Sequence, residues 1–165
     1  MSRAARAETA SSTFRIWRLT KARYARTCLD GEGARKAGGR WNERGVAVAY
    51  CASTLSLAVL ELLVHVDAST IPDDMMAVPI TVPDDVRIED LRPPKGYDTV
   101  PVSRAAQRAG SAWVTEGRTL LLRVPSVVVP EEMNVLVNPA HADIARLVVG
   151  RARPFRFDPR LVRRA

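Results

Sequence analysis

The stretch GGRWNERGVAVAYCASTLSLAVLELLVHVD, residues 38–67, decides how this chain folds. Residues 46–50 have the apolar character of a short buried strand, and residues 53–66 have the length of a helix. From residue 55 to residue 66 only a serine, a glutamate and a histidine interrupt an otherwise apolar run. A helix that is apolar on almost every face belongs inside a domain. The pattern therefore predicts a strand followed by a buried helix at the centre of the fold.

Glu61 is the carboxylate in the middle of this predicted helix. Removing a charged group from water is costly, so a buried carboxylate needs hydrogen-bond donors or cations around it. Arg40 and Tyr50 are the candidate partners within the same unit. A structural role, in which Glu61 sits at a gap in the packing and pairs with a surface arginine, explains the pattern equally well.

Length and composition predict one soluble globular domain. A chain of 165 residues with 47% hydrophobic residues can bury a core without metal or disulfide staples. Cys28 and Cys51 are too few for a disulfide framework, so we expect buried thiols in a reducing cytoplasm. No apolar run reaches the roughly 20 residues that span a bilayer. Residues 1–12 are predicted to be a flexible leader before a single domain at residues 13–165.

The charge of the chain leaves several classes of partner open. A net charge of +7 favours an anionic partner such as a nucleic acid, an acidic protein or a phosphate-bearing small molecule. The arginines are scattered, and three each of Trp, Tyr and Phe provide few surfaces for stacking single-stranded bases. Two histidines without metal-ligand spacing argue against a metalloenzyme, and the absence of a G-x-S-x-G motif argues against a Ser-His-Asp hydrolase.

The rest of the chain consists of short apolar runs bounded by turn residues, a pattern typical of strands. Residues 27–39, rich in glycine and charge, are predicted to be a mobile loop, and residues 103–116 a helix that ends at Gly117. The sequence therefore predicts an α+β domain with many short strands and few helices. The segments predicted as strands are 14–19, 76–82, 86–91, 119–124, 127–129, 134–137 and 152–157.

Several short motifs occur together in a defined order. They are Arg18 in the first predicted strand, GGRWN at residues 38–42, Tyr50, Ser53, residues 58–61, VPS at 124–126, NVLVNPAH at 134–141 and FRFDPRL at 155–161. In this combination the chain resembles the RES-domain family, the toxin half of bacterial Xre–RES toxin–antitoxin pairs. The resemblance covers residues 14–161. The family name reflects Arg, Glu and Ser residues, which correspond here to Arg40 (or Arg18), Glu61 and Ser126.

The resemblance implies an ADP-ribosyltransferase-like fold, with small mixed or antiparallel sheets and few helices around a cleft that binds NAD. It also implies a cytoplasmic toxin that depletes NAD by hydrolysis or phosphorolysis of the nicotinamide–ribose bond and thereby arrests growth. Some members are described instead as transferring ADP-ribose to a protein. The implied partner is an Xre-type antitoxin that covers the active site and links the toxin to DNA only indirectly.

Glu61, Arg40 and Tyr50 are the predicted catalytic residues. Cleavage of the nicotinamide–ribose bond builds positive charge on the sugar, which a carboxylate at Glu61 can stabilise. The guanidinium of Arg40 can grip the pyrophosphate or a ribose, although a surface arginine paired with Glu43 or Asp67 fits the same position. The ring of Tyr50 can stack on nicotinamide, or it can be a core tyrosine with a satisfied hydroxyl.

Arg18, Ser126 and Asn138 are predicted to bind NAD together with Arg40 and Tyr50. Each of the three has a structural alternative: a strand arginine extended to water, a turn serine, and an asparagine that caps the turn before Pro139. No metal is expected. The sequence leaves open whether water, phosphate or a protein accepts the ADP-ribose, and how many copies assemble. A non-enzymatic alternative is a basic module that binds nucleic acid.

Overall fold

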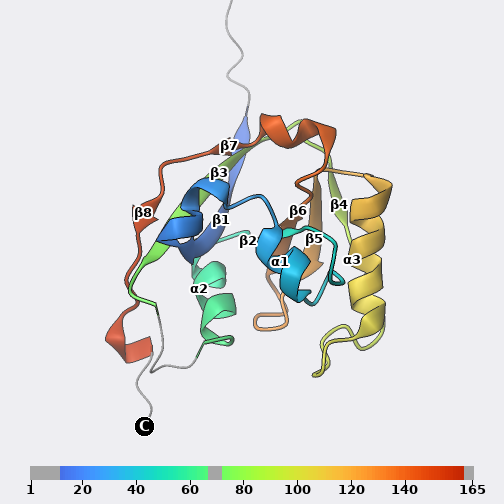
Figure 1. Cartoon of the computed structure of the whole chain (residues 1–165), viewed down its shortest axis with the longest axis horizontal. Coiled ribbons are helices and arrows are strands. Elements are labelled where there is room, and N and C mark those ends of the chain that lie inside the picture. Colours follow the sequence, from blue (N-terminus) through green and yellow to red (C-terminus); the bar gives the residue numbers. More distant parts are fainter. Residues whose placement is uncertain (1–11, 67–71, 162–165) are drawn as a thin grey trace, which may run out of the picture.

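The computed structural model describes residues 12–66 and 72–161, so the predicted leader lies outside the described residues except for Ser12. The structure contains one eight-stranded sheet, in which seven strands lie in the order β4-β5-β6-β2-β1-β3-β7 and β8 pairs with β3 beside this path (Figure 1). The β4–β5 pair is parallel and the other pairs are antiparallel. This mixed sheet with few helices confirms the predicted α+β class.

The elements are short, as predicted. The strands are β1 (Thr13–Lys21), β2 (Ala49–Ala52), β3 (Met75–Pro83), β4 (Ile88–Asp90), β5 (Leu121–Pro125), β6 (Met133–Val137), β7 (Val148–Val149) and β8 (Arg153–Pro154). The helices are α1 (Glu32–Ala37), α2 (Leu55–Leu63) and α3 (Arg104–Glu116), with 3₁₀ turns at Ala22–Thr27, Ala142–Arg146 and Pro159–Leu161.

Several predicted boundaries were wrong for local reasons. The strand predicted at residues 46–50 begins at Ala49, because the Asn42 amide donates to the carbonyls of Glu43 and Val46 at 3.2 and 3.0 Å and holds a turn there. The loop predicted at 27–39 contains α1. The strand predicted at 127–129 is a turn, because the Ser126 hydroxyl accepts hydrogen bonds from the two backbone N–H groups of residues 128 and 129.

Both faces of the central strands are buried. Leu121 of β5 and Val135 of β6 face one core, whereas Leu122 and Leu136 face a second core. Figure 1 shows α3 along one flank of the molecule, and the buried Trp113 of that helix belongs to the second core. Because these strands are covered on both sides, they form the rigid part of the scaffold.

The helix predicted to be buried, α2, is only half covered. Thr54 caps its N-terminus by accepting a hydrogen bond from the Leu57 N–H at 3.0 Å. Leu57 packs against β1 and β2, but Leu60 and Val64 are 38% and 58% exposed. The expectation of a largely buried helix therefore holds for one face of α2 alone, and an apolar face with Leu60 meets solvent.

The sheet is weakest between β1 and β2. Every residue of β1 from Thr13 to Lys21 has a partner in β3, whereas β1 and β2 share the single register pair Trp17 and Ala52. Beyond that pair the two halves of the sheet diverge, as Figure 1 shows for β1 and β3 on one side and β5 and β6 on the other. This divergence leaves space for a cavity beside β1 and β2, although the hydrogen-bonded path through the sheet is continuous.

A glycine in α3 allows the helix to approach the GGRWN segment (residues 38–42) closely. A Cβ atom at Gly110 would lie 1.9 Å from the carbonyl oxygen of Trp41. Such a separation is far inside van der Waals contact, so no other residue fits at this position without moving the backbone. The glycine therefore fixes α3 against the segment that leads into the cavity.

We expect Gly110→Ala to lower the free energy of unfolding by at least about 2 kcal/mol, because overpacking against backbone outweighs the helix propensity that alanine adds. Urea unfolding followed by circular dichroism measures this change. Gly33→Ala in α1 is the matched control, since a Cβ there meets no atom within 4 Å. Equal stability of the two variants would contradict the proposed close approach.

Candidate active site

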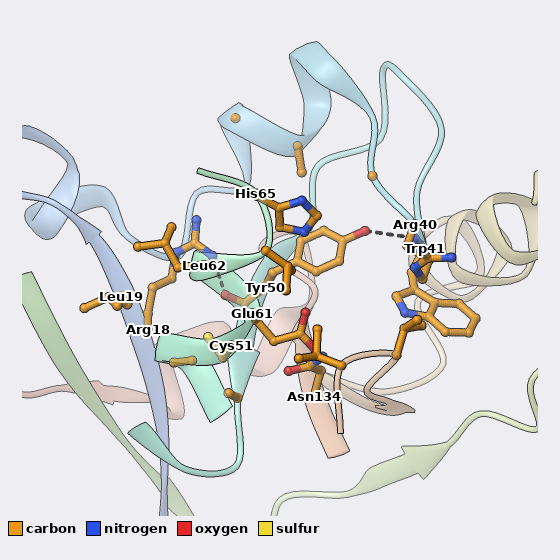
Figure 2. Close-up of a pocket in the computed structure, with 18 of the residues that line it drawn as sticks. Arg18, Leu19, Arg40, Trp41, Tyr50, Cys51, Glu61, Leu62, His65 and Asn134 are labelled. Carbon is orange, nitrogen blue, oxygen red and sulfur yellow. Dashed lines mark hydrogen bonds between the residues drawn. The ribbon is translucent and has the colours of Figure 1, made fainter. Parts of the chain in front are cut away.

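A cavity of about 890 Å³ lies where the two halves of the sheet diverge. Its walls come from β1, the GGRWN segment, β2, α2, the loop before α3, the turn after β5 and the start of β6. The volume lies in the range of pockets that enclose small-molecule ligands. The lining is mainly apolar, and its charged side chains are Arg18, Arg40 and Glu61, joined by His65. Figure 2 shows Glu61 between Arg18 and Arg40 in that view.

Glu61 is held by two neutral donors and not by the partners predicted from the sequence. The Ser126 hydroxyl donates to Glu61 Oε1 at 2.7 Å, and the Asn134 amide donates to the same oxygen at 2.5 Å. Neither Arg40 nor Tyr50 makes a hydrogen bond to this carboxylate. No donor from the described residues reaches Oε2, so one oxygen is fixed and the other remains available in the cavity.

Arg18 crosses the gap between β1 and β2. Its Nη1 donates to the backbone carbonyl of Tyr50, so the guanidinium joins the two strands where their ladder has opened. Its Nε–H is buried and has no hydrogen-bond partner among the described residues. Leaving a buried donor unsatisfied costs about 1–3 kcal/mol, so this nitrogen is suited to bind an anionic or carbonyl oxygen of a ligand.

Tyr50 belongs to a network within the GGRWN segment. Its hydroxyl donates to Asn42 Oδ1 at 2.7 Å and accepts from the Trp41 N–H at 3.0 Å. A Cβ at Gly39 would lie 2.5 Å from this hydroxyl, so only glycine fits beside it. Burial raises the pKa of Tyr50 above its ordinary value of 10.0, although the charges of Arg40 and Arg18 oppose this shift. Tyr50 is therefore a neutral wall of the cavity with its hydroxyl already engaged.

Arg40 ties the GGRWN segment to the loop before α3. Its Nη1 donates to the carbonyls of Tyr97 and Thr99 at 2.6 and 3.1 Å, and the ring of Trp41 stacks on that of Tyr97 at 5.8 Å. The predicted surface pair with Glu43 does not form, and Asp67 lies outside the described residues. The guanidinium keeps further N–H groups for a ligand in the cavity that it lines.

The remaining predicted residues separate into two groups. Ser126 is fully buried behind the cavity wall and reaches the site through Glu61. Asn138 does not line this cavity; its amide donates to the Val114 carbonyl at 3.2 Å and accepts from Ala140 N–H at 3.0 Å, so it caps the turn after β6. Asn134 was missed by the sequence reasoning, and its place 73 residues after Glu61 in the chain offered no signal beyond the NVLVNPAH motif.

The two cysteines are buried thiols, and Cys51 also lines the cavity. Both are free and buried, and burial raises the pKa of Cys51 to about 12, so its thiol stays protonated at neutral pH. Within residues 12–66 and 72–161 no group of His, Cys, Asp or Glu is arranged to hold a metal ion. In the same ranges no helix is long and apolar enough to cross a membrane.

The divided mixed sheet thus surrounds a mainly apolar cavity that contains one hydrogen-bonded carboxylate and two arginines. The model of the RES domain family matches residues 15–158 of this chain. The chain belongs to the RES-domain family, and the resemblance stated from its motifs is confirmed. It is therefore a RES-domain toxin of the kind found in toxin–antitoxin systems.

Curated proteins that match over nearly the full length of both chains are named as toxins. The Prs ADP-ribosylating toxin of Sphingobium sp. (strain YBL2) is 44% identical over 93% of this chain and 99% of that protein. Toxin Res of Yersinia enterocolitica is 36% identical over 88% of this chain and 98% of that protein. Among solved structures, the M. tuberculosis MbcT–MbcA toxin–antitoxin complex contains a chain that matches with a TM-score of 0.66 at 20% identity, covering 92% of this chain and 88% of that one. This structural match supports the fold.

We expect Tyr50→Phe to lower the free energy of unfolding at neutral pH by about 1–3 kcal/mol, because Asn42 and the Trp41 N–H lose their partner. Since the folded state holds the Tyr50 proton more tightly than the unfolded state, the advantage of the wild type is complete below pH 10 and shrinks above it. The loss is about 1.4 kcal/mol per pH unit until the hydroxyl ionises in the folded state.

Urea unfolding of both proteins between about pH 8 and pH 11 measures this difference. Tyr24→Phe, at a side chain that is 50% exposed, is the control and should change stability by less than about 0.5 kcal/mol. A stability gap between wild type and Tyr50→Phe that stays constant through pH 11 would show that the hydroxyl is open to water.

Proposed function

We propose that this RES-domain toxin consumes NAD by cleaving the nicotinamide–ribose bond. The observation that carries the proposal is the carboxylate of Glu61, one oxygen of which receives no hydrogen bond from the described residues, in an apolar cavity that also contains Arg18 and Arg40. NAD joins a cationic nicotinamide ring to an anionic pyrophosphate, so it matches a site with both signs of charge. The toxin names of the relatives agree with this assignment.

The two arginines account for binding. The buried Nε–H of Arg18 lacks a partner among the described residues, and a phosphate or ribose oxygen would satisfy it. Arg40 is anchored by the carbonyls of Tyr97 and Thr99, so its remaining N–H groups are held in a fixed direction. Two guanidinium groups anchored on different parts of the chain can orient a dinucleotide with little loss of freedom at the moment of reaction.

Glu61 accounts for the chemistry. As the bond from ribose C1′ to the nicotinamide nitrogen breaks, both electrons leave with nicotinamide, which becomes neutral, and positive charge develops on the sugar. A carboxylate oxygen in an apolar cavity stabilises this charge more strongly than water does. An acceptor oxygen then forms the new bond to C1′ and releases its proton to solvent.

The acceptor distinguishes two versions of the function. Water or phosphate as the acceptor gives depletion of NAD, which is our first proposal. Transfer of ADP-ribose to a protein is the second, and the relative named Prs ADP-ribosylating toxin, at 44% identity, favours it. Measuring nicotinamide release with and without phosphate, and following labelled NAD in a cell lysate, separates the two. A labelled protein band in the lysate supports transfer, whereas labelled free ADP-ribose or its phosphate supports depletion.

The mouth of the cavity is suited to a protein partner. Three valines line the cavity and are 58%, 88% and 36% exposed: Val64, which follows the last residue of α2, and Val100 and Val102 of the loop before α3. An apolar rim of this kind is typical of surfaces that are covered in a complex. We therefore propose that an antitoxin covers the site within a cytoplasmic pair; the structural neighbour was solved as a toxin–antitoxin complex, which supports an antitoxin as the partner.

We expect Glu61→Gln to lower the rate of nicotinamide release by about 10²–10³-fold, because the amide keeps the size of the side chain and loses its charge. Arg40→Ala should raise the KM for NAD. Both variants should relieve growth arrest on expression and leave cellular NAD at its normal level. Arg156→Ala, an exposed arginine outside the cavity, is the control for loss of positive charge.

Toxicity that persists in Glu61→Gln with falling NAD would show that another residue carries the reaction. Toxicity that persists without any change in NAD, and that disappears when Arg156 is replaced, would favour the basic nucleic-acid-binding alternative. In that case binding to nucleic acid in vitro should weaken steeply with added salt.

A further inference from the structure

The carboxylate of Glu61 is held from two directions by groups on different segments of the chain. The Ser126 hydroxyl donates from the turn after β5, and the Asn134 amide donates from β6, both to Oε1. Asn134 lies opposite Ala52 of β2 and Val124 of β5 in the sheet, so its backbone is paired on both sides. Figure 2 shows the Asn134 side chain beside that of Glu61.

The hydrogen bonds of Ser126 fix the direction in which its proton points. Its Oγ accepts from the Val128 N–H at 3.1 Å and the Val129 N–H at 2.9 Å. A serine hydroxyl has two acceptor lone pairs and one hydrogen. With both lone pairs occupied by backbone donors, the hydrogen is left to donate to Glu61 Oε1 at 2.7 Å. The turn therefore orients Ser126 as a donor toward the carboxylate.

Ser126 is also shielded from any ligand. It is 0% exposed and does not line the cavity, although its neighbours Pro125 and Val127 do. A side chain in this position cannot touch a dinucleotide in the cavity without a change in the turn. Its influence on the site has to pass through Glu61.

We propose that Ser126 and Asn134 are positioning residues that hold Oε1 of Glu61 so that Oε2 points at the reacting sugar. This inference rests on the proposed function, because it needs Glu61 to be the reacting carboxylate. A glutamate has three rotatable side-chain bonds, and fixing them before the reaction removes a cost that would otherwise be met in the transition state. The two donors also replace the water that a carboxylate loses in an apolar cavity.

The test is the kinetics of nicotinamide release by purified Ser126→Ala and Asn134→Ala proteins. We expect kcat to fall about 10- to 100-fold in each variant, the range that follows from misplacing a reacting group by up to about 1 Å. For Ser126→Ala the KM for NAD should stay within about threefold, because this residue contributes no contact to the ligand. Asn134 lines the cavity and can contact NAD directly, so the KM of the Asn134→Ala protein does not distinguish positioning from binding.

A double-variant cycle separates positioning from general damage to the fold. In a Glu61→Gln background, Ser126→Ala should lower the residual rate no further, since the group that it positions has already lost its charge. Thr54→Ala is the matched control: it removes the N-terminal cap of the helix that carries Glu61 without touching the carboxylate. It should lower the unfolding midpoint and leave kcat unchanged.

An unchanged kcat in Ser126→Ala, or an equal further loss in the Glu61→Gln background, would overturn the positioning role. If the wild type releases no nicotinamide, either alone or in a cell lysate, the proposed function fails. The contact itself is then tested by urea unfolding of the wild type, Ser126→Ala, Glu61→Gln and the double variant. Non-additive effects of Ser126→Ala and Glu61→Gln on the unfolding midpoint would confirm that the two side chains interact. Additive effects would show that the hydrogen bond between Ser126 and Glu61 contributes nothing to stability, and would refute the positioning role as well.

Discussion

The opening between β1 and β2 is the constraint on which the rest of the structure depends. A sheet that paired these strands along their whole length would leave no room for a cavity, but they share one register pair. Arg18 donates to the Tyr50 carbonyl across the opening and so replaces a missing backbone hydrogen bond with a charged side chain. The fold thus places a cation at the base of its cavity through the same contact that keeps the two halves together.

Polar groups in an apolar cavity are stable only where the scaffold supplies partners, and here each partner comes from a different segment. Glu61 on α2 depends on the turn after β5 and on β6, whereas Arg40 depends on the loop before α3. Tyr50 fills its hydrogen bonds within the GGRWN segment. The carboxylate and the arginines do not neutralise one another, which leaves both signs of charge available to a ligand.

The sequence predicted the presence of helices and strands more reliably than their boundaries or their burial. The apolar runs located β3, β5, β6 and α3 to within a few residues, because buried strands and an amphipathic helix have periods that a sequence displays. The helix α2 has no such contrast between its faces, so the pattern did not reveal that Leu60 and Val64 are exposed. The turn at residues 126–129 contains only apolar residues after Ser126, and hydrogen bonds to that hydroxyl decide its shape.

The sequence by itself determined the α+β class and the RES-domain membership, and it predicted Glu61 and Arg40 as catalytic residues, because all three inferences depend on residue types and on motif order along one chain. Only the tertiary structure decided that Ser126 and Asn134 hold Glu61, that Arg18 bridges two strands and that Asn138 caps a turn away from the cavity. The physical reason is that a hydrogen bond between side chains more than sixty residues apart depends on strand register and on side-chain direction. Neither is encoded in the local pattern of apolar and polar residues.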